Sequence, residues 1–129
     1  MGMKTEHEEQ REFVQWMRQT HHARIFAIPN GGQRSRTTGA KLKAEGVSAG
    51  VPDLYIPKWR CWVEMKRETG RVSPAQKDWI AYLESIGNTV IVGQGCEDAK
   101  EKITWYITFA ADVAAYKNRT HGSAFYSGD

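Results

Sequence analysis

Apolar residues recur with a helical period in two parts of the chain. Residues 6–18 place apolar side chains at helical spacing between polar ones, and Thr5 is suited to be the N-cap. Residues 73–87 form the second pattern, in which Ser73 caps, a proline takes the first helical position and Gly87 ends the helix. Further helical segments are expected at 96–103 and 110–118.

Short apolar runs bounded by proline, glycine and turn residues predict the strands. They lie at 24–29, 53–57, 61–66, 88–93 and 104–108, and the first and fourth are expected to be buried. Residues 30–50 contain five glycines, and we expect a long loop with one helical turn at 40–46. The resulting order of elements predicts a small α/β domain with a central mixed β-sheet flanked by helices.

The length of the chain, 129 residues, fits a single domain. We assign it to residues 1–118 and expect residues 119–129, which show no periodicity, to be a flexible tail. No apolar run approaches the roughly 20 residues needed to cross a bilayer, and the charged N-terminal region lacks the apolar core of a secretory signal. Two cysteines are too few for a disulfide framework. We therefore expect a cytoplasmic protein with reduced thiols.

The charge of the chain is mildly basic, with a formal net charge of +3. Its basic residues gather in the glycine-rich segment and in the region that follows, at Arg34, Arg36, Lys41, Lys43, Lys58, Arg60, Lys66, Arg67 and Arg71. A solvated basic face and a nucleic-acid-binding surface both fit this distribution. Charge alone therefore permits a nucleic-acid partner without requiring one.

Two acids and a lysine on the predicted strands suggest a site. Glu64 and Lys66 share one face of their strand because alternate side chains do, and Asp53 opens the preceding strand. If the two strands pair, Asp53 lies beside Glu64, and the two carboxylates repel unless a cation lies between them. Mg²⁺ prefers such oxygens, and the backbone carbonyl of Met65 is a natural further ligand. An exposed acid–X–lysine on an ordinary surface strand is the alternative reading.

The wider pattern favours the metal site over the ordinary surface strand. Four linked segments and the first helical segment resemble the VRR-NUC branch of the PD-(D/E)xK nuclease superfamily, in order and with compatible spacing up to about residue 107. They are "IPNGGQR" (28–34), "GAKLKAEGVSAGVPDL" (39–54), "WVEMKRETGRVSPAQKDW" (62–79), "GNTVIVGQG" (87–95) and "EHEEQREFVQWMR" (6–18). The resemblance implies a restriction-endonuclease-like core.

The resemblance also implies roles for individual residues. Asp53 and Glu64 would bind the metal, and Lys66 would be the catalytic lysine that orients or activates the attacking water. Gln76 matches a glutamine that the family places near the active site, where its carboxamide could reach the phosphate or the lysine, although it could equally be a surface residue. An acid of the first helix would complete the metal shell, for which Glu6 is our choice and Glu9 the alternative.

The resemblance further implies a Mg²⁺-dependent DNA endonuclease, with Mn²⁺ as a substitute and no nucleotide cofactor. Residues expected to contact DNA are Asn30, Arg34, Arg36, Lys41, Lys43 and Arg67. Stand-alone members of the family look like Holliday-junction resolvases that act as homodimers on branched DNA, and such short nucleases are typical of bacteriophages, which would place the protein in the host cytoplasm. The alternatives are a flap or nicking endonuclease, a non-catalytic DNA-binding module, and an interaction protein without a metal site.

Overall fold

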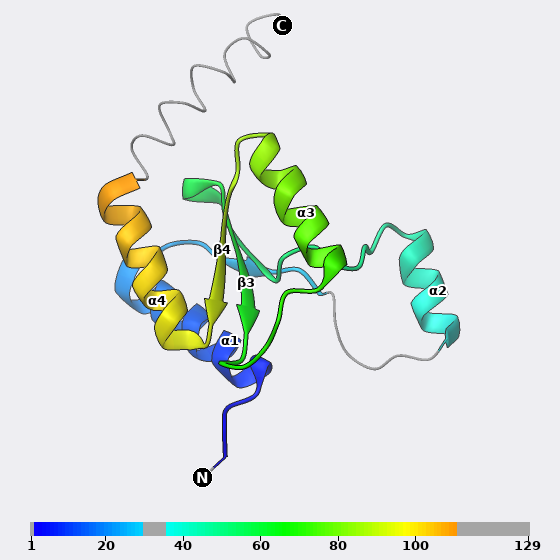
Figure 1. Ribbon diagram of the computed structural model, residues 1–129, viewed down its shortest axis with the longest axis horizontal. Coiled ribbons are helices and arrows are strands. Elements are labelled where there is room, and N and C mark those ends of the chain that lie inside the picture. Colours follow the sequence, from blue (N-terminus) through cyan, green and yellow to red (C-terminus); the bar gives the residue numbers. More distant parts are fainter. Residues whose placement is uncertain (1, 30–35, 111–129) are drawn as a thin grey trace, which may run out of the picture.

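The computed structural model describes residues 2–29 and 36–110 (Figure 1). The predicted tail at 119–129 and nearly all of the helical segment at 110–118 lie outside these residues, as do Asn30 and Arg34. The described helices and strands, in chain order, are α1 (Glu6–Trp16), the π-helical turn η1 (Met17–His21), β1 (Phe26–Ala27), α2 (Arg36–Ala44), β2 (Leu54–Ile56), the 3-10 turn η2 (Pro57–Trp59), β3 (Cys61–Lys66), α3 (Pro74–Ser85), β4 (Thr89–Gln94), α4 (Cys96–Trp105) and the π-helical turn η3 (Tyr106–Ala110). None of the described helices is long and apolar enough to span a membrane.

The four strands form one mixed sheet in the order β1-β2-β3-β4, as the order of elements predicted. The first three strands are antiparallel neighbours, and β4 runs parallel to β3 after the crossover through α3. Leu54 pairs with Val63 in the β2–β3 register. This register puts the residue before Leu54 next to the residue after Val63, so Asp53 lies beside Glu64.

Helices cover the two faces of the sheet unequally. α1 and α4 pack on one face, while α3 lies on the other, and α2 stands apart from the sheet beyond α3 (Figure 1). The core fills the space under α1 and α4. Its largest fully buried side chains include Phe13, Met17, Leu54, Met65 and Ile103. The opposite face carries the polar residues of β3, which fixes where a site can form.

Two local signals in the sequence position the helices as predicted. The Thr5 hydroxyl accepts a hydrogen bond from the Glu8 backbone N–H at the start of α1. At the start of α3, Ser73 and Gln76 form a complete capping box, in which each side chain bonds the other's backbone N–H. Each cap satisfies N–H groups that have no partner within the helix.

The predicted strand at 104–108 is wrong, because these residues continue α4 and η3 as helix. The buried residues of this region are Cys96, Ala99, Ile103 and Tyr106. Their spacings of three, four and three residues follow one side of a helix that packs on the sheet. The apolar run at 104–108 is short enough to fit either period, and the helical pattern that begins at Cys96 determines the outcome.

Two further predictions need correction. The strand expected to be buried at 24–29 is reduced to Phe26–Ala27, and both residues are exposed, because β1 is the edge strand of the sheet. The single helical turn expected at 40–46 is the nine-residue helix α2, which starts earlier, at Arg36. Glycine in the helix lowers its propensity without preventing it, which is why the glycine content of the segment was misleading.

Candidate active site

Asp53 and Glu64 meet on the face of the sheet opposite the core. Glu64 is only 1% exposed although it carries a carboxyl group. Asp53 precedes β2, and its Oδ2 accepts a hydrogen bond of 2.8 Å from the Met65 backbone N–H. The strand pairing and this hydrogen bond hold the two carboxyl groups together, as expected from the sequence.

Burial and mutual proximity change how the two acids ionise. Burial raises the pKa of Glu64 to about 8, and the negative charge of Asp53 adds to this rise. Burial raises the pKa of Asp53 as well, although the hydrogen bond from Met65 opposes it. The interaction between the two carboxyl groups raises the pKa of Glu64 further and opposes the rise in the pKa of Asp53. The pair therefore resists carrying two negative charges unless a cation is present.

Gln76 orients Glu64 from α3. Its Nε2 donates a hydrogen bond of 2.9 Å to Glu64 Oε2, while its Oε1 accepts one of 2.8 Å from the Ser73 backbone N–H. The carboxamide thus bonds Glu64 rather than the lysine. Ser73 was recognised from the sequence only as a helix cap, yet the capping-box spacing also fixes the carboxamide that holds Glu64.

Glu64 Oε1 has no hydrogen-bond partner among the described residues, although it is buried. Buried polar atoms are nearly always paired, so an unpaired carboxylate oxygen indicates a site for a ligand. Oε2 is already held by Gln76, which leaves Oε1 as the oxygen available to a cation. The carboxylate is therefore held in place with one oxygen free to bind.

Lys66 lies on the same face, two residues beyond Glu64. Its side chain is largely buried, and its Nζ lies 3.9 Å from Glu64 Oε2. At this distance the ammonium partly offsets the acid charge without closing a short hydrogen bond. The Lys66 carbonyl accepts a hydrogen bond of 2.7 Å from the Gly95 backbone N–H, which holds the end of β3 beside the turn before α4.

The two candidate acids of α1 have different surroundings. Glu9 is buried, and its Oε1 accepts a hydrogen bond of 3.1 Å from the Cys96 backbone N–H at the start of α4. Glu6 is exposed, and its charge raises the pKa of Glu64, so it lies within electrostatic reach of the acid pair. Glu9 therefore has a structural partner, whereas the carboxylate of Glu6 faces solvent near the site.

The residues present fit a hard divalent cation such as Mg²⁺. Two carboxylates, one of which has an unpartnered buried oxygen, provide ligands of the kind that Mg²⁺ prefers, and water would complete its octahedral shell. Within residues 2–29 and 36–110, no group of three or more His, Cys, Asp or Glu side chains could hold a metal ion. The described acids thus provide a pair, which Glu6 does not join in a preassembled cluster. The role of the Met65 carbonyl stays a prediction.

The predicted DNA-contacting residues are only partly described. Lys41 and Lys43 are exposed on α2, and Arg67 is exposed directly after β3, one residue from Lys66. Arg36 begins α2, while Asn30 and Arg34 lie outside the described residues. Among the described members of this set, Arg67 follows Lys66 directly in the chain, and Lys41 and Lys43 lie on α2.

Comparisons with known proteins agree with this arrangement. The sequence model of the VRR-NUC domain matches residues 2–96. A solved structure described as a VRR_NUC domain protein is similar over 83% of this chain and 91% of that chain, with a TM-score of 0.68 and 28% sequence identity. A search of curated proteins gave no match. The matched region contains Asp53, Glu64, Lys66 and Gln76.

Proposed function

Because the chain belongs to the VRR-NUC domain family, which is of nuclease type, we propose that it is a Mg²⁺-dependent, structure-specific DNA endonuclease. Its substrate is branched DNA, with the four-way junction as the preferred form, and it acts as a homodimer. Mn²⁺ substitutes for Mg²⁺. Asp53 and Glu64 hold the metal with Glu6 and the Met65 carbonyl, and Lys66 acts on the attacking water.

The observation that carries this proposal is the buried acid pair with a lysine beside it. Desolvating Glu64 next to Asp53 is unfavourable, in line with the raised pKa of Glu64. A DNA-binding surface alone would need cations at this place instead. A site that binds a divalent cation and a phosphodiester together accounts for all three residues.

Gln76 and Lys66 have different roles at this site. A bound Mg²⁺ would neutralise the acids, polarise the scissile phosphate and lower the pKa of a coordinated water. Gln76 keeps Glu64 oriented through the hydrogen bond to Oε2. The Lys66 ammonium, three donors on a buried stem, is placed to donate to the attacking water or to a phosphate oxygen as negative charge develops in the transition state.

Branched DNA and the homodimer are supported by the resemblance and by symmetry. Two copies related by a two-fold axis present two equivalent acid pairs, and resolution of a four-way junction requires paired cuts on opposing strands. The matched family region covers residues 2–96. In this proposal, recognition of DNA shape comes from the nuclease domain and its dimer.

The test compares cleavage of labelled four-way junction, 5′-flap and plain duplex DNA in Mg²⁺ and in Mn²⁺. Lys66→Ala should abolish cleavage, while Lys102→Ala, which removes an exposed lysine on α4, should not. Symmetric, Lys66-dependent cuts in the junction support the proposal in full. Cleavage of flap or duplex alone would keep the chemistry and reject the junction, and cleavage that persists in Lys66→Ala would reject the site.

A further inference from the structure

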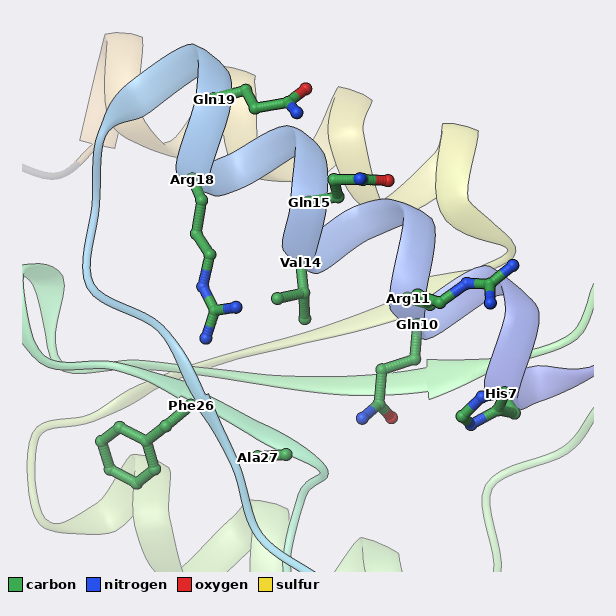
Figure 2. Close-up of a pocket in the computed structure, with 9 residues that line it drawn as sticks. All are labelled: His7, Gln10, Arg11, Val14, Gln15, Arg18, Gln19, Phe26 and Ala27. Carbon is green, nitrogen blue, oxygen red and sulfur yellow. The ribbon is translucent and has the colours of Figure 1, made fainter.

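A groove separates α1 and η1 from the edge strand β1 (Figure 2). Its volume is about 500 Å³, within the range of roughly 300–1,000 Å³ typical of sites for small organic groups. Basic residues line it at His7, Arg11 and Arg18, and glutamines add amide groups between them. None of the nine described residues that line the groove is acidic. The groove therefore suits an anionic occupant.

The basic residues of α1 line the groove, and its acidic residues do not. The helix also carries four acids, Glu6, Glu8, Glu9 and Glu12, and all of them lie outside the groove lining. Glu12 is paired with Lys4 at 2.7 Å, and Glu9 is bonded to the start of α4. Figure 2 shows Arg18 and Gln10 pointing from the helix towards β1. The positive charge on this side is consequently not cancelled by the acids of the same helix.

Phe26 borders the groove on β1, and Figure 2 shows its ring pointing away from α1. Because Phe26 pairs with Tyr55 and Tyr55 pairs with Trp62, the ring lies on the face of the sheet that carries Glu64. Phe26 is 47% exposed, and its ring makes an edge-on contact with Tyr55 at a centroid distance of 5.8 Å. The contact fixes one edge of the ring and leaves much of the side chain open. Exposed aromatic rings beside positive charge are the combination with which proteins bind single nucleic-acid strands, because every base offers a face for stacking.

The groove is connected to the acid pair at both walls. On the strand side, Ala27 pairs with Leu54, and the Ile28 backbone N–H donates a hydrogen bond of 2.7 Å to the Asp53 carbonyl. On the helix side, His7 follows Glu6, whose charge reaches Glu64. A polymer bound at the acid pair would have to pass over the edge strand β1, and over the ring of Phe26, to enter the groove on the side of α1.

We propose that this groove binds a single DNA strand that continues from the phosphodiester held at the acid pair. Arg11 and Arg18 contact its phosphates, and Phe26 stacks against a base. Arg18 Nη2 donates a hydrogen bond of 3.0 Å to the Ile25 carbonyl, which fixes its guanidinium and leaves other N–H groups for a phosphate. The path of the strand rests on the proposed nuclease function, whereas binding to the groove can be measured without cleavage.

The test measures binding of a labelled single-stranded oligonucleotide by fluorescence anisotropy in EDTA, over a range of salt concentrations. Log K, where K is the association constant, falls linearly with the logarithm of the salt concentration. Arg11→Gln should make this fall less steep by about 0.7, the value for one lost phosphate contact on a single strand. Arg11→Lys should keep the slope because it keeps the charge. Phe26→Ala should weaken binding roughly 5- to 150-fold, the range for removing one stacked base. Lys102→Gln removes the same charge on α4 and is the control. Because Lys102 also bonds Asp98 and the Val92 carbonyl, thermal unfolding checks that this variant keeps its fold.

The outcomes separate this inference from the proposed function. An unchanged slope in Arg11→Gln, an equal loss in Lys102→Gln, or no binding by the wild-type protein would overturn the groove as a DNA site. A change in sedimentation mass instead of DNA affinity would make it a contact between copies, and would also overturn it. If the wild-type protein cleaves no DNA while Arg11→Gln reduces the salt dependence of binding as expected, the groove is supported as a DNA site and the nuclease proposal fails. If cleavage depends on Lys66 while Arg11→Gln binds the oligonucleotide as the wild type does, the nuclease proposal is supported and the groove is rejected as a DNA site.

Discussion

The two faces of β3 are both buried, yet they contact different surroundings. Cys61, Val63 and Met65 are fully buried against α1 and α4, among apolar side chains. Glu64 and Lys66 alternate with them and are 1% and 8% exposed on the other face, where Gln76 is the hydrogen-bond partner of Glu64. A strand of six residues thus carries a core on one side and a charged site on the other.

The difference shows how stability and binding are separated within one element. Each apolar side chain on the core face stabilises the fold by roughly 1.5–3 kcal/mol through burial. On the other face, removing charges from water is unfavourable unless partners compensate, and Glu64 Oε1 has none among the described residues. The core face should therefore respond to loss of volume, and the site face to pH and cations.

Met65→Ala should produce the largest effect on stability. Truncating a fully buried methionine leaves a cavity and should lower the free energy of unfolding by about 2–5 kcal/mol, while the backbone N–H that binds Asp53 is retained. Urea unfolding followed by circular dichroism measures the change. Met65→Leu, which nearly conserves volume, should cost less than about 1.5 kcal/mol. Equal stability of the alanine variant and wild type would contradict the assignment of this face to the core.

Divalent cation should stabilise the site face by a comparable amount. At about 100 times its Kd, Mg²⁺ should raise the free energy of unfolding by about 2.7 kcal/mol, because it binds the native state only. Asp53→Asn should remove most of this gain, since it removes one of the paired carboxylates. Thermal unfolding with and without Mg²⁺ gives the measurement, and Asp78→Asn, at an exposed position of α3, is the control. A gain that survives in Asp53→Asn would place the cation elsewhere.

The pH dependence of the metal-free protein should be set by Glu64. Its pKa is about 8 in the folded protein and 4.5 ordinarily. Between these values the folded protein keeps a proton that the unfolded chain has released, so stability should fall as pH rises through this range. Glu64→Gln should reduce the fall, and the variant should be more stable than wild type at pH 8 relative to pH 4.5. Chemical unfolding at several pH values across this range measures the change. If the stability of the wild type and that of Glu64→Gln depended on pH in the same way, the assignment to Glu64 would be wrong.

Ser73→Ala should have the smallest effect on stability, about 1 kcal/mol for one lost helix cap. It should also lower cleavage, because losing the bond from the Gln76 backbone N–H to Ser73 Oγ loosens the first turn of α3, from which Gln76 holds Glu64. Thr5→Ala removes the corresponding hydroxyl cap of α1 and should lose similar stability with little change in cleavage. Thermal unfolding gives the stability of both variants, and the rate of DNA cleavage gives their activity. Equal rates would limit the role of Ser73 to helix initiation.

Local signals in the sequence predicted the elements that carry the site. The family resemblance is confirmed by the match to residues 2–96, and the mixed sheet is confirmed by the fold. Alternation along 61–66 separated Val63 and Met65 from Glu64 and Lys66, and the two strands pair with the register that brings Asp53 to Glu64. These features depend on neighbours in the chain and on one hairpin, which is why pattern alone could predict them.

Features that depend on tertiary packing were not predicted. Residues 104–108 follow the helix that starts at Cys96, and β1 is exposed because it is an edge strand. The partner of Gln76 depends on how α3 lies over the sheet. The sequence likewise could not separate Glu6 from Glu9, because their difference lies in the contact between Glu9 and the start of α4.

The contact between Glu9 and Cys96 has a consequence for how the molecule opens. It joins α1 to the start of α4 across 87 positions of the chain, so the two helices and the sheet on which they pack should exchange amide hydrogens as one slow cooperative unit. α2, which stands apart from the sheet, should exchange quickly and independently. Asp53 and Glu64 would then keep their positions while α2, which carries Lys41 and Lys43, unfolds and refolds many times. Bound DNA would stabilise α2 next to acids that are already in place.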